Sequence, residues 1–281
     1  MLVICFVPAL MNNRNIILAI SLPLSFLVIL VSSAGLFIPG FYAAETLNWQ
    51  AQAVGQDMIN LFFIVPCLLI TSIAAFRNKK YAVPIWGGIM LYLTYTFVIY
   101  CFTIHFNRLF IVYCLCLGLP FYALVYLWLL QYRENIFSGM EKKAGTRYVG
   151  IYLLLIAVLF YTLWLAEIIP ANIKNTIPNS LQQTGLLTNG VQVLDLAIIL
   201  PGIFITGILL LNKNAAGFML TPILLTFFIC MDVTIGFLAI LMKMKGISSN
   251  AAVTVVMAAL AIVSTVLLIW FLKPGKASIK R

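Results

Sequence analysis

Residues 57–76 have the sequence DMINLFFIVPCLLITSIAAF, and this stretch decides the solvent in which the chain folds. Its only charged residue is Asp57, at the first position. An α-helix needs about 20 predominantly apolar residues to cross the hydrocarbon core of a bilayer, and this stretch has that length. Because lipid offers no partner to backbone amides and carbonyls, a segment that crosses it must bond them internally. The stretch therefore predicts a transmembrane helix.

Similar apolar stretches recur along the 281 residues. The chain is 64% hydrophobic and 9% charged, a balance that a water-soluble domain of this length would not tolerate. We therefore expect an all-α fold, a polytopic membrane bundle of about eight transmembrane helices with the lipid bilayer as its solvent. The expected spans are Ile16–Ile38, Asp57–Phe76, Val83–Phe106, Leu109–Leu130, Val149–Ile169, Val191–Leu211, Ala216–Met242 and Asn250–Leu272.

The Lys and Arg residues are divided unevenly between the two ends of these spans. Thirteen of the 17 fall on the side of the N-terminus, and the others are Arg108, Lys174, Lys243 and Lys245. Cytoplasmic loops of membrane proteins carry an excess of positive charge, so both termini are expected in the cytoplasm. The expected segments are 1–13 (cytoplasmic, with Met11 as an alternative start), 14–131 and 149–272 (two four-helix halves), 132–148 (basic cytoplasmic loop) and 273–281 (basic cytoplasmic tail).

Neither the net charge nor the cysteines indicate a nucleic acid, a metal or a cofactor. The net charge of +10 comes from short basic clusters between apolar runs, so no nucleic-acid partner is expected. The six cysteines lie within apolar runs and include no C-x-x-C pair, and His105 is the only histidine. These residues predict neither a zinc site nor a disulfide framework. The H-E-x-x-H, G-x-S-x-G and Walker motifs are also absent from the sequence.

An internal repeat becomes visible when the sequence is shifted by 135 residues. The shift lays NLFFIVP, which ends at Pro66, over DLAIILP, which ends at Pro201, and it lays Thr71 over Thr206. Each proline removes a backbone hydrogen bond and is expected to kink its helix. Two halves of four helices each would point the same way, as in the parallel repeats of some transporters. The sequence therefore favours a 4+4 repeat with an axis along the membrane normal.

Polar residues at the start of two matched spans form the main candidate site. Asp57 aligns with Gln192, and Asn60 aligns with Asp195, so each half supplies one acid and one amide on a single helical face. We expect these four side chains to meet across the repeat axis, beside the interrupted helices, as at a transporter's solute or ion site. In the alternative, Asp57 and Gln192 are helix N-caps at the membrane interface.

Asp232 lies deep within an expected span, where an ionised group is costly unless water, a partner or a ligand stabilises it. The segment of the first half that aligns with it contains Tyr92, Tyr95 and Tyr100, whose phenols can donate hydrogen bonds to a carboxylate or a solute. We expect Asp195 and Asp232 to face one cavity that is reachable from outside. A structural hydrogen bond between helices is the alternative for Asp232.

The polar run 43–57, the pair Thr94-Tyr95 and the segment 106–110 (FNRLF) resemble those of a loose group of uncharacterised bacterial multi-pass membrane proteins. The resemblance covers the middle two-thirds of the chain. It implies a bacterial cytoplasmic membrane and no particular activity.

Three functions are compatible with these features. A small-solute secondary transporter or permease, coupled to protons or cations, is favoured by the repeat, the prolines and the acids within the spans. Its partner would be an unidentified small solute or ion. A non-catalytic accessory or sensory membrane protein would use the same polar residues for structure alone. A membrane-embedded enzyme would need a convergent nucleophile, acid–base pair or metal set, which the sequence does not supply.

Overall fold

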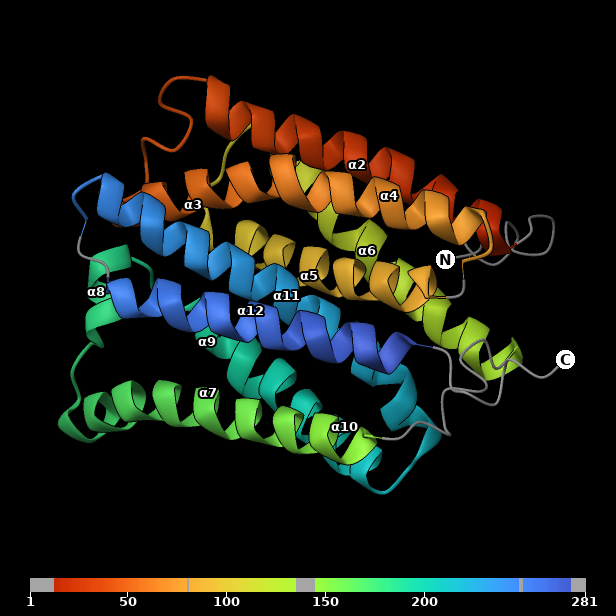
Figure 1. The fold of residues 1–281 in the computed structure, drawn as a ribbon. Coiled ribbons are helices and arrows are strands. Elements are labelled where there is room, and N and C mark those ends of the chain that lie inside the picture. Colours follow the sequence, from red (N-terminus) through yellow and green to blue (C-terminus); the bar gives the residue numbers. More distant parts are fainter. Residues whose placement is uncertain (1–12, 80, 135–144, 248–249, 274–281) are drawn as a thin grey trace, which may run out of the picture.

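The computed structural model describes residues 13–79, 81–134, 145–247 and 250–273. In this part of the chain the secondary structure consists of helices, without strands. Eight helical spans are long and apolar enough to cross a membrane, and they run side by side as a bundle (Figure 1). The prediction of an all-α, multi-pass membrane protein is therefore confirmed. The expected N-terminal segment, basic loop and basic tail lie mostly outside the described residues.

The spans follow one another along the chain with short connections. The first half contains α2 (Asn13–Phe37), α3 (Leu47–Ile59), η2 (Asn60–Ile64), α4 (Val65–Phe76), α5 (Ala82–Thr103) and α6 (Phe110–Glu134). The second half contains α7 (Thr146–Lys174), α8 (Asn179–Thr184), α9 (Gly190–Leu194), η3 (Asp195–Ile199), α10 (Leu200–Leu211), α11 (Ala215–Met244) and α12 (Ala251–Leu272). The π-helical segments η2 and η3 join their neighbours into continuous spans, Leu47–Phe76 and Gly190–Leu211.

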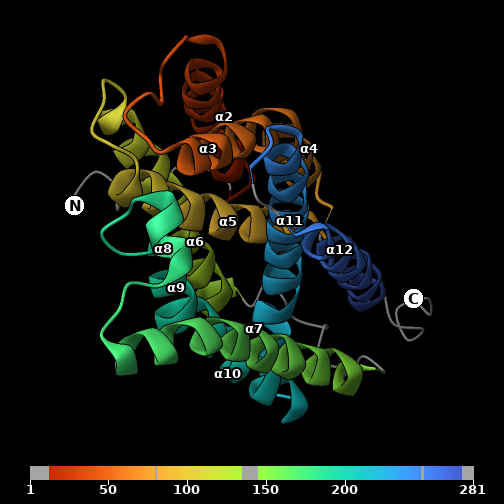
Figure 2. The same cartoon turned by 90° about the vertical axis from the view of Figure 1, so that its left-hand side faces the viewer.

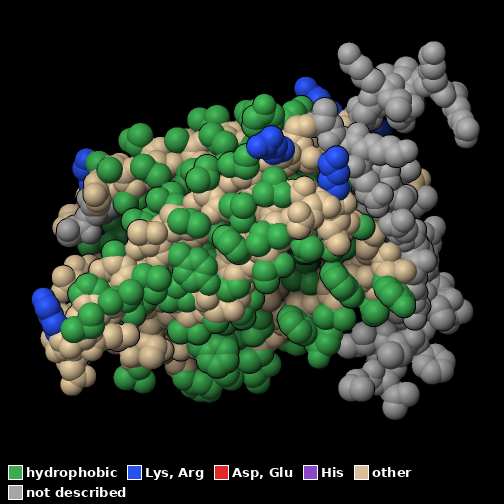
Figure 3. All heavy atoms as spheres, turned by 90° about the horizontal axis from the view of Figure 1, so that it is seen from below, with side chains coloured by type: hydrophobic (Ala, Val, Ile, Leu, Met, Phe, Trp, Pro, Cys, Tyr) green, Lys and Arg blue, Asp and Glu red, His purple; other side chains and the backbone are tan. Residues whose placement is uncertain are grey.

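The outer surface of the bundle is apolar. Large hydrophobic side chains such as Phe26, Phe102 and Ile111 are exposed on it. Figure 3 shows one face, where hydrophobic side chains cover the area between the helix ends and Lys and Arg side chains are few. Water-soluble monomers rarely expose a continuous apolar area of this extent. Lipid is the solvent that suits this surface.

Helices α5 and α11 form the centre of the bundle, where they pack against each other and are the most buried spans. Within the first half, α2 packs on α4, α4 on α5 and α5 on α6. Within the second half, α7 packs on α10, α10 on α11 and α11 on α12. Across the halves, α3 packs against α11 and α9 against α5 (Figure 2). Each half therefore places the start of its second span beside the third span of the other half.

Two π-helical segments interrupt the second and the sixth span at matching places. Segment η2 begins at Asn60 and η3 begins at Asp195, 135 residues later, and each ends two residues before a proline. The N–H of Val65 bonds to the Asn60 carbonyl, and the N–H of Leu200 bonds to the Asp195 carbonyl. A proline has no N–H to donate, so the turn before it already lacks a regular bond and widens readily.

The same spacing relates the ends of these two spans. The hydroxyls of Thr71 and Thr206 donate to the carbonyl four residues earlier, both at 2.7 Å. In the turns that follow, Asn78 and Lys213 adopt left-handed backbone conformations, with φ of 64° and 56°. The 135-residue spacing seen in the sequence thus recurs in the local geometry of both spans and of their turns.

The second span begins earlier than expected. Residues 47–56 are expected in an outer loop, but they form the first turns of α3. The side chains of Thr46 and Asn189 cap α3 and α9. Asp57 lies within the span and is fully buried, and Gln192 lies beyond the cap of its helix. The alternative that Asp57 and Gln192 are N-caps is therefore wrong.

Candidate functional site

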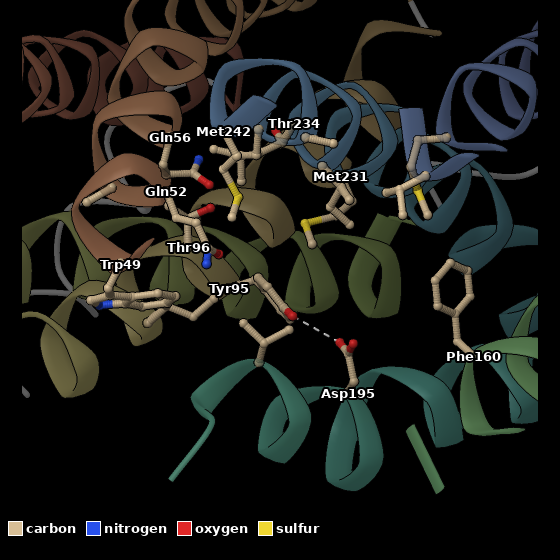
Figure 4. Close-up of a pocket in the computed structure, with 18 of the residues that line it drawn as sticks. Trp49, Gln52, Gln56, Tyr95, Thr96, Phe160, Asp195, Met231, Thr234 and Met242 are labelled. Carbon is tan, nitrogen blue, oxygen red and sulfur yellow. Dashed lines mark hydrogen bonds between the residues drawn. The ribbon is translucent and has the colours of Figure 1, made fainter. Parts of the chain in front are cut away.

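A cavity of about 490 Å³ lies between the two halves of the bundle. Its wall residues come from the starts of α3, α9 and α12 and from the later parts of α5, α7 and α11, with the first residue of η3. These segments lie toward one end of the bundle, the end at which α8 lies (Figure 1). Figure 4 shows the side chains that point into the cavity. The site is thus within the membrane-spanning part of the molecule and nearer one end of it.

Amide side chains of α3 form a polar strip of the cavity region. Asn48, Gln52, Gln56 and Asn60 recur every four residues and therefore share one side of the helix. Gln52 Nε2 donates to Asn48 Oδ1 at 2.7 Å, and Gln56 Nε2 donates to Asn60 Oδ1 at 3.0 Å. Gln52 and Gln56 line the cavity, whereas Asn60 is buried behind them. The two glutamine carbonyl oxygens are available as acceptors for a solute.

Asp195 is the acid at the interrupted helix in the cavity wall. Its Oδ1 accepts a hydrogen bond from the Tyr95 phenol at 3.0 Å, and its Oδ2 accepts one from the Trp164 indole at 2.9 Å. Three spans converge here, because Tyr95 belongs to α5 and Trp164 to α7. Figure 4 shows the bond between Tyr95 and Asp195. Both donors are neutral, and no Lys, Arg or His is among the described residues that line the cavity. The carboxylate is hydrogen-bonded, but its charge is not neutralised.

Asp57 is buried behind the cavity wall. Its Oδ1 accepts a hydrogen bond from Tyr100 at 2.8 Å, and its Oδ2 accepts one from Tyr42 at 2.7 Å. Gly35 of α2 packs directly against this carboxylate and leaves no room for a side chain. Tyr100 itself lines the cavity, whereas Asp57 does not. The Tyr100 side chain therefore connects a fully enclosed acid to the cavity wall.

Tyr42 belongs to the loop between α2 and α3 and holds this loop against the bundle. Its side chain is buried, and its phenol reaches Asp57. Burial raises the pKa of the Tyr42 phenol well above its ordinary value, and the neighbouring charge of Asp57 adds to the effect. The phenol therefore stays protonated and keeps donating to the carboxylate at any physiological pH.

Tyr92 links α5 to α3 and α11 beside the cavity. Its hydroxyl lies 2.6 Å from the donor Gln56 Nε2 and 2.8 Å from Thr234 Oγ1, and both partners line the cavity. Asn60 Nδ2, buried next to this network, has no partner among the described residues. Leaving a buried donor unsatisfied costs about 1–3 kcal/mol. A buried water molecule is expected to bind there.

The four polar residues expected to meet across the repeat axis take separate partners instead. Asp57 and Asn60 are enclosed on the α3 side, and Asp195 lies in the cavity wall. Gln192 donates to Glu167 of α7 at 3.4 Å. The expectation of one shared cluster is therefore wrong. Helix α5 lies between the two acids and supplies a tyrosine to each.

Two tyrosines of α5 donate to carboxylates as expected, but neither donates to Asp232. Asp232 is buried on α11, and its carboxylate has no hydrogen-bond partner in the part of the chain that the structure describes. Ile235 and Ala239 of α11 line the cavity, and Asp232, at the edge of the same helix face, does not. Of the two acids expected to face one cavity, Asp195 lines it and Asp232 does not.

Sequence reasoning missed several residues of the polar wall, among them Gln52, Gln56, Trp164 and Glu167. The two glutamines precede the apolar stretch, and their signal is the four-residue spacing from Asn48 to Asn60, which marks a helix face. Trp164 and Glu167 lie near the end of an apolar run, where such residues are usually interfacial anchors. Their contacts to η3 and α9 depend on how α7 packs, which no local pattern reveals.

The arrangement is suited to binding. Within the described ranges, no group of three or more His, Cys, Asp or Glu side chains is placed to hold a metal ion. The cavity offers a largely apolar wall, amide acceptors and a carboxylate without a counter-ion. Comparison of the chain with known protein families, with curated proteins and with solved structures finds no match.

Proposed function

We propose that the protein is a secondary transporter, or permease, for a small solute, and that the cavity is its binding site. The observation that carries the proposal is the position of Asp195, in the wall of a cavity among the spans and at the start of an interrupted helix. An acid within a span is costly unless water, a partner or a ligand stabilises it. Interrupted helices beside polar groups are typical of the binding sites of transporters.

Asp57 is the proposed site of a coupling proton. Its carboxylate is enclosed and accepts two phenolic hydrogen bonds, and Tyr100 is one of the donors. A proton on Asp57 would turn one of its oxygens into a hydroxyl donor and a weaker acceptor, so the hydrogen bond from the phenol that donates to this oxygen would weaken or rearrange. Because Tyr100 lines the cavity, the protonation of Asp57 would change the contacts that Tyr100 makes with a bound solute.

The proposed architecture of this transporter is a parallel 4+4 repeat of 14–131 and 149–272. The matching π-helical segments, the matching turns and the same packing order in both halves support it. The mutual packing of α3 with α11 and of α9 with α5 is what a twofold axis near the α5–α11 contact would produce. A rotation near 180° about the membrane normal should superpose the second and third spans of the halves.

Both termini are proposed to lie in the cytoplasm, with the chain in a bacterial cytoplasmic membrane. The excess of Lys and Arg on the side of the N-terminus supports this orientation. The cavity would then lie in the outer half of the membrane. Reporter fusions test this orientation, because a reporter that works only in the cytoplasm should be active when it is fused after Arg281.

Proteoliposomes test the transport proposal. Wild type, Asp195→Asn and Asp232→Asn would be reconstituted around a pH-sensitive dye and exposed to small cationic, neutral and anionic amphiphiles, with and without a proton gradient. We expect a solute-dependent response in wild type, its loss in Asp195→Asn and its retention in Asp232→Asn, whose carboxylate does not line the cavity. Asp57→Asn is expected to keep solute binding and lose the dependence on pH. A wild-type protein that binds solutes but never moves them would favour a sensory or accessory function.

A further inference from the structure

We infer that the cavity takes a lipophilic organic cation, which reaches it from the bilayer between α7 and α12. The inference rests on the proposed function in that it names the class of solute for the same cavity. Three separate features of the site support it: its charge, the composition of its wall and the place where the wall opens.

The charge of the cavity selects a cation. Asp195 and Glu167 both line it, and the described lining residues contain no basic side chain. The Asp195 carboxylate accepts hydrogen bonds from the Tyr95 phenol and the Trp164 indole, and neither donor carries a positive charge. Neutral donors do not cancel the charge, so an unscreened negative potential remains inside the cavity. A cationic solute would supply the missing charge, whereas an anion of the same shape would be repelled.

The wall selects a cation with an apolar body. The aromatic residues Trp49, Tyr95, Tyr100, Phe160 and Trp164 line the cavity. Aromatic faces attract cations, and they also bury hydrocarbon. The methionines of the wall, Met231, Met242 and Met257, add flexible apolar surface that adapts to different shapes. A small hydrated cation would leave most of this surface without a contact.

The inferred opening of the cavity toward lipid lies between α7 and α12. The two helices contact each other toward the end of the bundle away from the cavity. There the hydroxyls of Tyr152 and Ser264 are hydrogen-bonded at 2.7 Å, and the ring centroids of Tyr148 and Trp270 are 6.5 Å apart. At the end where the cavity lies, the two helices form separate walls of it.

The rim of this opening is apolar. Leu163 of α7 lines the cavity and is also 56% exposed, and Val253 of α12 lines the cavity from the other side. A rim of this kind suits a solute that is dissolved in the bilayer, since a hydrophilic solute would have to leave water to reach it. The seam between α7 and α12 is therefore the entry route for a lipophilic cation.

A matched pair of probes tests the charge selectivity. Tetraphenylphosphonium and tetraphenylborate have nearly the same shape and opposite charge, and tetramethylammonium carries the positive charge without the apolar body. Binding to the purified full-length protein in detergent would be measured by equilibrium dialysis. We expect saturable binding of tetraphenylphosphonium that is at least about tenfold tighter than that of either other probe, a difference of about 1.4 kcal/mol per tenfold. Asp195→Asn should remove most of this preference, and Asp232→Asn should preserve it.

The outcomes separate this inference from the transport proposal. Equal or tighter binding of tetraphenylborate, or equal binding of tetramethylammonium, would overturn the assignment of a lipophilic cation, even if the protein transports another solute. Saturable binding of tetraphenylphosphonium without any flux in proteoliposomes would support the assignment and contradict transport.

A bulky residue at the rim tests the route. Leu163→Trp should slow the association of tetraphenylphosphonium in proteoliposomes several-fold, because the larger side chain narrows the seam. Leu165→Trp is the control, since Leu165 is exposed on the same helix but does not line the cavity. An unchanged association rate in Leu163→Trp, with binding intact, would show that the probe enters by another route.

Discussion

The second and the sixth span carry the same interruption and expose it differently. In the second span, Asn60 at the start of η2 is fully buried, and Asp57 one turn earlier is enclosed by Tyr42 and Tyr100. In the sixth span, Asp195 at the start of η3 is only half-buried and lines the cavity. The first half encloses its acid, and the second half presents its acid to the cavity.

The difference arises from the helix that covers each interruption. In the first half, α2 packs against α3, η2, α4 and α6, and its Gly35 touches the Asp57 carboxylate. In the second half, α7 packs chiefly on α10, and it reaches Asp195 through Trp164 at the cavity wall. The exposure of each proline-linked π-helical segment therefore depends on how the preceding span packs against it.

The largest effect on stability is expected when an acid is placed at the start of η2, the more enclosed of the two π-helical segments. Asn60→Asp would bury a second carboxylate one turn from Asp57, and an acid within a span costs about 2.5–3.5 kcal/mol. Asp195→Asn makes the reverse change at the start of η3, which lines the cavity. It should alter the free energy of unfolding by less than about 1 kcal/mol, because the amide oxygen can still accept one of the two hydrogen bonds. Unfolding of the purified protein in detergent, followed by circular dichroism, measures both. Equal free energies of unfolding in the two variants would mean that the starts of η2 and η3 are equally exposed.

A smaller difference is expected between two tyrosines of α5. Tyr100→Phe removes a donor from the enclosed Asp57 and should destabilise the protein by about 2 kcal/mol, because hydrogen bonds to buried charged groups contribute about 1.5–3 kcal/mol. Tyr95→Phe removes a donor from Asp195, where water in the cavity can replace it, and should cost about 1 kcal/mol or less. The same unfolding measurement compares them. A larger loss in Tyr95→Phe would contradict the assignment of Asp57 as the enclosed acid.

Much of the bundle follows from the sequence, because lipid imposes one rule on every span. The eight spans follow from their apolar length, and the 135-residue shift identifies the places where η2 and η3 lie. The start of α3 does not follow, because residues 47–56 are rich in amides and resemble a polar loop. Their burial comes from packing against α2 and α11, which supplies apolar contacts that the segment itself lacks.

The candidate site is predictable in its residue types and unpredictable in its pairings. Asp195, Tyr95 and Tyr100 can be singled out from their positions within the spans. Their partners cannot, because helix periodicity fixes which residues share a face and leaves open which helix that face meets. Asp232 illustrates the limit, since a shift of one residue along α11 separates it from Met231, which lines the cavity.

The space beside the enclosed acid offers the next test. Gly35→Ala would place a methyl group against the Asp57 carboxylate and the Tyr42 ring, and overpacking of this kind costs about 1–2 kcal/mol. Gly118→Ala in α6 is the matched control, because a Cβ there meets nothing within 4 Å. The control should be neutral or stabilising by about 0.5–1 kcal/mol, as alanine is the better helix former. A neutral Gly35→Ala would show that the Asp57 pocket can expand and is less enclosed than its contacts indicate.

The smallest effect is expected at the prolines. Pro66→Ala and Pro201→Ala each restore a backbone N–H, and neighbouring helices should still hold the π-helical segments, so the free energy of unfolding should change by less than about 1 kcal/mol. Molecules that relax to a regular α-helix would turn Asp195 by about 100° relative to α10, away from the donors Tyr95 and Trp164. Pro201→Ala should therefore weaken tetraphenylphosphonium binding by about twofold to fivefold, and Pro66→Ala should weaken it less, since the α3 residues that line the cavity include no carboxylate. Equilibrium dialysis of both variants measures this difference. If Pro66→Ala weakened binding as much as Pro201→Ala, the closed interruption would be shaping the cavity too, and the separation between the two spans would be lost.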